Sequence, residues 1–306
     1  MSVAGPTSGR RRMIGAFFRN STACLGAAVV LLVLAYCVVV PLVSPYDPED
    51  ADFSAVREPP SAEHWLGTDQ FGRDIFTRLA AGGLVTLTIA GAALAVILVI
   101  GVAYGATSGL LGGRVDTVMM RLLDGLLAIP RLPVSIVILV VVGLQAQNVQ
   151  TVVLALSIVN WMITARLVRG EIVFLKRQDY VRAAQALGAG RRAVARRHVV
   201  PNAFGIVLVA LFLELPAVIL GEAFLSVLGL GPEAPTPTWG NIALEGITFG
   251  RLWLVFLPSL AIAIFAVGAN LLADGLGDTL DPRRWGAARV GRRWRKLAEQ
   301  PAPEIV

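Results

Sequence analysis

The sequence has few of the residues from which enzymes and cofactor-binding proteins build their sites. Only 16% of its 306 residues are charged, and it contains two lysines, two histidines and two cysteines. Neither lysine follows a glycine, which excludes a phosphate-binding GxxxxGK loop. Cys24 and Cys37 fall in one apolar run, and His64 and His198 fall in separate loops. We therefore expect that the chain is not an enzyme and binds no metal or cofactor of its own.

Long apolar segments dominate the chain instead. Hydrophobic residues make up 56% of it, and the mean hydropathy is +0.70. A helix needs about 20 mainly apolar residues to cross a hydrocarbon core roughly 30 Å thick. The sequence thus predicts an all-α, polytopic membrane protein with six transmembrane helices, at 22–43, 84–110, 117–143, 149–168, 203–229 and 252–276.

The distribution of basic residues predicts the orientation of these helices. Segments on one side of the membrane hold 22 Lys and Arg residues, and those on the other side hold four. Because basic residues are retained on the cytoplasmic side, we expect cytoplasmic tails at 1–21 and 277–306 and a cytoplasmic loop at 169–202. The net charge of +6 then follows from topology, so nucleic acid is not expected as a partner.

The segment 44–83 is predicted to be extracytoplasmic. Its first half is rich in Asp, Glu and Pro, which is typical of irregular chain. In its second half Asp69 with Arg73, and Asp74 with Arg78, stand four residues apart, a spacing at which opposite charges pair on a helix. We expect a short helix there, lying on the membrane surface.

Two patterns inside the spans predict local geometry. Pro130 and Pro133 stand about one turn apart in the third span, which indicates a kink. Gly101, Gly105 and Gly109 recur at every fourth position of the second span, which allows close approach by another helix.

The fifth span carries two acids, Glu214 and Glu222. They are eight residues apart, so both can face one interior. Charged side chains inside a membrane are costly and are candidates for function. One interpretation is a polar lining of a translocation path for a cationic or amino-bearing solute, together with Asn160, Trp161 and Ser226. The other is that each carboxylate is satisfied by a neighbouring helix.

The stretch 179–202 interrupts the apolar segments with a short, basic helical pair. Tyr180, Ala184 and Leu187 follow helical spacing and predict one apolar stripe, before Gly188 and Gly190 break the helix. A second short helix is predicted to follow, ended by a proline. It carries Arg191, Arg192, Arg196 and Arg197, and the proline is Pro201. Either anionic lipid headgroups or a docked soluble protein would offset the repulsion between these cations.

A family resemblance favours the docked protein. Ala183 and Ala184, then Gly188 and then Pro201 resemble the EAA loop of ABC importer permeases. The match is partial, because Arg182 replaces a glutamate, His198 an isoleucine and Val200 a leucine of that pattern. The stretches "HWLGTDQFGRD" at 64–74 and "LGLGPEAPTPTWGN" at 228–241 resemble the C-type permease subunit of dipeptide, oligopeptide and nickel importers.

The resemblance implies a type I ABC importer permease fold, with a core at 84–276, in a bacterial cytoplasmic membrane. It implies a second, homologous permease subunit, two cytoplasmic ATPases that use ATP and Mg, and an extracytoplasmic substrate-binding protein. The ATPase-coupling residues would be Tyr180, Arg182, Ala183, Ala184, Leu187, Gly188, Ala189, Arg191, Arg192 and Pro201.

The solute implied is a dipeptide or oligopeptide, with nickel, glutathione or an opine as alternatives in the same family. A carrier or channel independent of ATPases is the rival from another class, but we find no internal repeat of the kind common in secondary carriers. The segment 228–241 is expected to belong to the extracytoplasmic mouth, as a dock for the binding protein or as a connecting turn. Trp239 would then lie in the interfacial belt.

Overall fold

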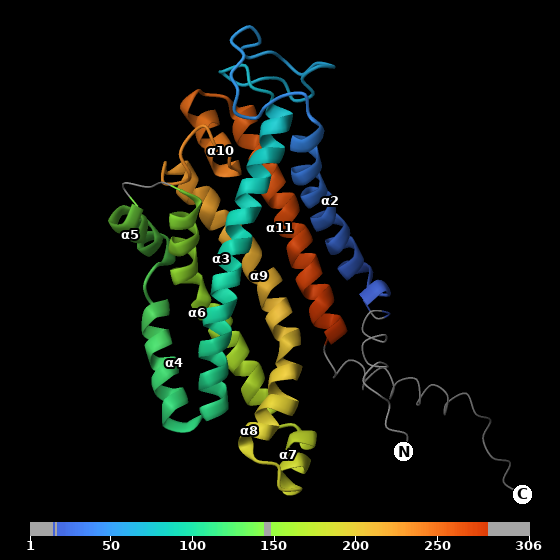
Figure 1. Ribbon diagram of the computed structural model, residues 1–306, viewed down its shortest axis with the longest axis vertical. Coiled ribbons are helices and arrows are strands. Elements are labelled where there is room, and N and C mark those ends of the chain that lie inside the picture. Colours follow the sequence, from blue (N-terminus) through green and yellow to red (C-terminus); the bar gives the residue numbers. More distant parts are fainter. Residues whose placement is uncertain (1–14, 16, 144–147, 281–306) are drawn as a thin grey trace, which may run out of the picture.

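The computed structural model describes residues 15, 17–143 and 148–280, and these form an all-helical bundle (Figure 1). Most of the predicted tails at 1–21 and 277–306 lies outside the described residues. The elements are α2 (Ser21–Val43), α3 (Ile75–Leu111), α4 (Gly113–Leu127), α5 (Arg131–Gly143), α6 (Val149–Leu175), α7 (Asp179–Ala186), α8 (Arg191–Val194), the π-turn η1 (Ala195–Val199), α9 (Val200–Val227), α10 (Trp239–Thr248) and α11 (Leu252–Leu280). We call the two ends of the bundle the α7 end and the α10 end.

Among the described residues, five helical segments are long and apolar enough to cross a membrane, and there are six if one bent pair of helices counts as a single span. The five are Ser21–Val43, Ile75–Leu111, Val149–Leu175, Arg192–Val227 and Leu252–Thr279. The broken pair is α4 and α5, bent by 82° at residues 128–130. The kink predicted at Pro130 is therefore confirmed, since a proline disfavours helical geometry in the residue before it. The all-helical, membrane-spanning prediction is likewise confirmed.

The core forms where α3 packs along α6 (Figure 1). Gly101, Gly105 and Gly109 all face α6, as the four-residue repeat predicted. A Cβ atom at Gly105 would overlap the carbonyl oxygen of Ala165, and one at Gly101 would lie 2.8 Å from Cβ of Thr164. These glycines thus bring the two backbones into direct contact.

The predicted surface helix is wrong. Residues 67–74 form a turn with an isolated bridge between Thr68 and Asp74, and α3 begins at Ile75. Gly72 has φ +77, which breaks a helix at that residue. The Asp74 side chain accepts a hydrogen bond from the Thr77 amide at 2.8 Å, so Asp74 caps α3. The residues that suggested a surface helix are thus divided between this turn and the start of a span, which begins at Ile75 instead of residue 84.

The prediction for Trp239 is also wrong. This residue begins α10, a helix that the hydropathy pattern did not reveal, and its side chain is fully buried. Its indole Nε1 donates a hydrogen bond to the Leu79 carbonyl at 3.0 Å. Trp239 therefore joins α10 to α3 inside the protein and does not sit in an interfacial belt.

Pro201 does not end the second short helix. The helical run continues without interruption from Arg192 to Val227, through the π-turn η1. In that turn the Val200 amide bonds to the Ala195 carbonyl, five residues back. A proline ring clashes with a regular helix before it, and the wider π-turn relieves this clash. The second short helix and the fifth span are thus one continuous helix.

Candidate functional site

The hairpin of α7 and α8 projects from the α7 end of the bundle, between α6 and α9 (Figure 1). Its inner face is anchored by Val181, Val194 and Val199, which are at most 3% exposed and pack on Val168 and Ile172 of α6. A hydrophobic contact of this kind fixes the hairpin to both flanking spans. The sequence reasoning missed Val181, although it lies one turn before Ala184 on the same face.

The turn between α7 and α8 has a defined geometry. Gly188 has φ +86, and its amide donates to the Gln185 carbonyl at 2.9 Å. The Ala189 amide donates to the Ala184 carbonyl at 3.0 Å. This pair of bonds is the Schellman motif, which places a glycine after a helix. The predicted helix break at Gly188 is therefore a fixed C-terminal cap of α7.

The predicted apolar stripe divides between two faces. Ala184 packs inward with the anchored valines, whereas Leu187 is 89% exposed and Tyr180 is 43% exposed. Partial burial raises the pKa of the Tyr180 phenol above its ordinary value. Arg182, Ala183, Arg192 and Pro201 are exposed, Ala189 is half-buried, and Arg191 begins α8.

Glu222 belongs to a saturated polar cluster at the α10 end. Its carboxylate accepts hydrogen bonds from Ser226 Oγ at 2.8 Å and Thr86 Oγ1 at 3.1 Å. Thr86 Oγ1 in turn accepts from the Trp239 amide at 3.1 Å. Glu222 and Ser226 are fully buried. The cluster joins α3, α9 and α10. For Glu222 this agrees with the second interpretation of the buried acids, in which a neighbouring helix satisfies the carboxylate.

Glu214 has no hydrogen bond to that cluster, and its Oε2 atom has no hydrogen-bond partner among the described residues. The Asn160 Oδ1 atom accepts a hydrogen bond from Arg131 at 3.3 Å, and the Arg131 guanidinium acts electrostatically on Glu214. Trp161 stacks edge-on against Tyr104, with ring centroids 5.0 Å apart. Of the five predicted path residues, only Glu222 and Ser226 are thus joined directly by a hydrogen bond.

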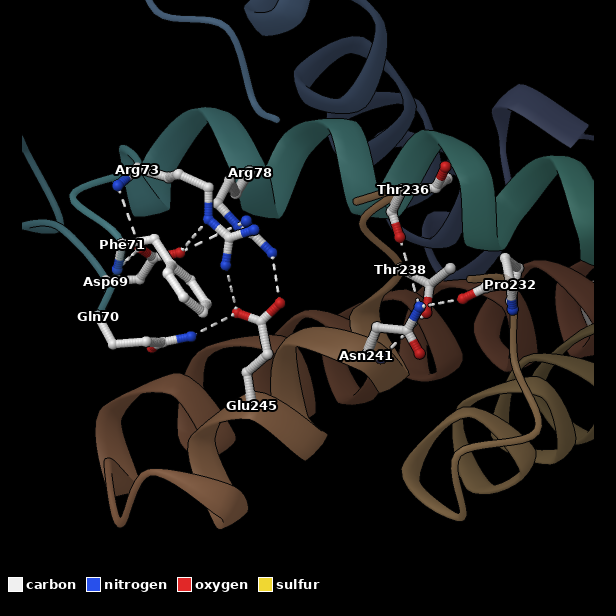
Figure 2. A network of polar contacts seen from close by, with 10 residues as sticks. All are labelled: Asp69, Gln70, Phe71, Arg73, Arg78, Pro232, Thr236, Thr238, Asn241 and Glu245. Atoms are coloured by element: carbon white, nitrogen blue, oxygen red, sulfur yellow. Dashed lines mark hydrogen bonds and ion pairs between the residues drawn. The ribbon is translucent and has the colours of Figure 1, made fainter. Parts of the chain in front are cut away.

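A buried charge network holds the α10 end together (Figure 2). Asp69 Oδ2 accepts from Arg73 Nε at 2.7 Å, which confirms that predicted pair. Glu245 on α10 accepts from Arg73 at 2.7 Å, from Arg78 at 2.9 Å and from Gln70 at 3.0 Å. The sequence reasoning missed Glu245, because its partners lie 167 to 175 residues away.

The predicted pair of Asp74 and Arg78 is wrong. Arg78 turns towards Asp69, 3.4 Å away, and towards Glu245. Asp74 instead caps α3 and lies 3.0 Å from Nδ1 of His64. Once Asp74 is outside the helix, its side chain does not share a face with Arg78.

The loop before α10 is also fixed (Figure 2). The Asn241 amide nitrogen Nδ2 donates to the carbonyls of Pro232 at 2.8 Å and Thr236 at 3.4 Å. Thr238 Oγ1 accepts from the Asn241 amide at 3.0 Å and so caps α10. The backbone of segment 228–241 is therefore held in place by Asn241, which fits either a dock for the binding protein or a connecting turn.

Comparison with known proteins identifies the family to which this chain is similar and several relatives. Residues 101–286 match the family described as binding-protein-dependent transport system inner membrane component, and residues 10–60 match the N-terminal TM domain of oligopeptide transport permease C. The oligopeptide transport system permease protein OppC of Bacillus subtilis is 40% identical over 269 residues, 87% of each chain.

Two further relatives agree with these matches. The dipeptide permease protein DppC of B. subtilis is 37% identical, over 87% of this chain and 83% of its own. OppC of Escherichia coli K12 is 36% identical, over 87% of this chain and 89% of its own. A chain from the crystal structure of an amino acid ABC transporter with histidines superposes with a TM-score of 0.48, at 19% identity, over 66% of this chain and 91% of that one.

Proposed function

The chain belongs to the family of binding-protein-dependent transport-system inner-membrane components, and on that premise we propose that it is one of two permease subunits of an ATP-driven peptide importer. The relatives that span 87% of the chain are oligopeptide and dipeptide permeases, which favours peptides over nickel, glutathione or opines as the solute. A second, homologous permease would complete the translocation path.

The α7 end faces the cytoplasm in this proposal. The segments assigned to that side carry 22 of the 27 basic residues, and basic residues are retained there during insertion. The α10 end, with the segment 44–74, then faces the extracytoplasmic binding protein. The charge network around Glu245 and the capped loop before α10 would give that protein a rigid surface.

The α7–α8 hairpin is the proposed contact for a cytoplasmic ATPase. The observation that carries this is Leu187, which is 89% exposed on a hairpin whose opposite face is buried against α6. An apolar side chain presented on a rigid helical projection suits a hydrophobic groove in a partner. The exposed arginines around it, Arg182 and Arg192, would form the rim.

Movement of the hairpin would reach the membrane directly. Its second half is continuous with α9, through the helical run Arg192–Val227, and its first half is anchored on α6. Closure of the two ATPases on ATP would thus displace spans that carry the path candidates. This is a two-state equilibrium biased by nucleotide in the partner subunits.

Leu187→Asp tests this contact in the complete transporter, purified with both ATPases. A carboxylate buried in an apolar groove costs several kcal/mol, so we expect more than a tenfold loss of peptide-stimulated ATP hydrolysis, or loss of the ATPases. Leu187→Met, which keeps an apolar side chain, should retain activity. Because Leu187 touches little of its own subunit, the thermal stability of the isolated permease should not change.

Val181→Asp is a control for a change that affects the fold of the permease and not its contact with the ATPase. Val181 is fully buried, so this change should destabilise the permease itself. A Leu187→Asp complex that keeps both ATPases and full peptide-coupled hydrolysis would contradict the proposed contact. Uptake into vesicles with a dipeptide, a tripeptide, a nickel chelate and glutathione would test the solute class, and we expect transport of the peptides.

A further inference from the structure

Arg131 occupies an unusual position among the basic residues. Of the 27 Lys and Arg residues, Arg131 is the one that lies in neither the cytoplasmic nor the extracytoplasmic segments of the predicted topology. It begins α5, directly after the break of 82° in the third span. A charged residue at this depth is costly and marks a functional site, with a partner to be identified.

The partners of Arg131 leave its charge only partly satisfied. In the described part of the chain, the guanidinium donates one side-chain hydrogen bond, to Asn160 Oδ1 at 3.3 Å. It acts on Glu214 electrostatically, yet no ion pair within 4.0 Å joins them among the described residues. Glu214 is only 5% exposed, and its Oε2 atom has no hydrogen-bond partner there. Two opposite charges are thus held near each other with bonding capacity to spare.

The backbone is interrupted beside Arg131 but not beside Glu214. Arg131 opens α5 directly after the break in the third span. In the first turn of α5, Pro133 has no amide hydrogen and the Val134 amide bonds to the Pro130 carbonyl. Pro216 lies inside α9, two residues after Glu214, and removes one hydrogen bond while the helix continues. A broken helix with a charged residue at its end is typical of solute sites in transporters.

The two residues differ in exposure. Arg131 is partly exposed at the surface of this subunit, whereas Glu214 is only 5% exposed. Arg131 is therefore the more accessible of the two charges. Glu222 differs from Glu214 because each of its carboxylate oxygens accepts a hydrogen bond.

We propose that Arg131 and Glu214 bind the two ends of a zwitterionic solute within the membrane. The guanidinium would take the C-terminal carboxylate of a peptide, and Glu214 would take its N-terminal ammonium group. Each charged end of the solute would lose its bound water and gain a protein group of opposite charge in its place. The inference rests on the proposed function as a peptide importer and adds the groups that recognise the solute.

The test uses the complete transporter in vesicles, with its binding protein saturated by peptide. Uptake is measured for a free tripeptide, its N-acetyl form and its C-terminal amide, and each rate is divided by the wild-type rate for the same peptide. This ratio cancels the selectivity of the binding protein. Asp124→Asn is the control and should alter no ratio. Asp124 pairs with Arg166, and each of these side chains is 52% exposed.

Each variant should affect only the peptide end that it recognises. Glu214→Gln should lower uptake of the free peptide at least tenfold and that of the N-acetyl form less than twofold. Arg131→Gln should likewise spare the C-terminal amide. If Glu214→Gln does not assemble, Glu214→Asp replaces it, and if Arg131→Gln does not assemble, Arg131→Lys replaces it. For each replacement we expect a raised KM for the free peptide and an unchanged KM for the peptide whose matching end is capped.

Two results would overturn the inference while the proposed function stands. One is an equal loss for all three peptides, and the other is recovery of wild-type rates in the Arg131→Gln/Glu214→Gln double variant. The second result would mean that the two charges only neutralise each other. A wild-type complex that hydrolyses ATP but transports no peptide would overturn the proposed function and this inference together.

Discussion

Replacing Glu245 by glutamine should destabilise the α10 end far more than loss of an exposed ion pair would. The change leaves Asp69 as the one remaining carboxylate for Arg73 and Arg78, whose side chains are 7% and 3% exposed. The new amide group would also point a donor at a guanidinium. Removing one partner of a buried ion pair costs about 3–5 kcal/mol.

The expected cost lies at the lower end of that range. Glu245 is 22% exposed, so water partly screens its interactions. We expect about 3 kcal/mol, or a roughly 150-fold larger unfolding constant. The Arg78→Gln/Glu245→Gln double variant should recover part of this loss, because Asp69 and Arg73 then balance each other.

Reversible unfolding in mixed detergent micelles, followed by tryptophan fluorescence, measures this difference. Asp124→Asn is the matched control, because Arg166 and Asp124 are each 52% exposed, and such pairs contribute at most about 1 kcal/mol. If Glu245→Gln costs no more than Asp124→Asn, or if the double variant is the least stable of all, the network does not hold the α10 end as we describe.

Two glycine substitutions test the packing and the hairpin. Gly105→Ala should destabilise the bundle by about 1–3 kcal/mol, because the new Cβ overlaps the Ala165 carbonyl, whereas Gly91→Ala has open space and should be neutral in the same unfolding assay. Gly188→Ala should cost about 1–2 kcal/mol through its φ of +86 and weaken the coupling of peptide to ATP hydrolysis, while Gly190→Ala should do neither. Equal effects within either pair would contradict the stated cause.

Several features of this protein were readable from sequence because they are local and repetitive. Apolar length alone identified the spans, since the membrane requires a minimum length of helix. The proline at 130 identified the break in the third span, and the repeat of Gly101, Gly105 and Gly109 identified a close helix contact. Gly188 identified the end of α7. Each signal acts within a few residues, so no tertiary information was needed.

The site residues depended on contacts between distant segments. Helix α10 is only ten residues long, and nothing in its composition showed that Trp239 is buried on α3. Glu245 binds Arg78 across 167 residues, and Arg131 binds Asn160 of the next span, 29 residues away.

Hydropathy and turn propensity therefore determined which segments enter the membrane and where they bend. Only the packing decided which charges meet, because the partner of a buried charge is chosen by three-dimensional proximity and not by spacing along the chain.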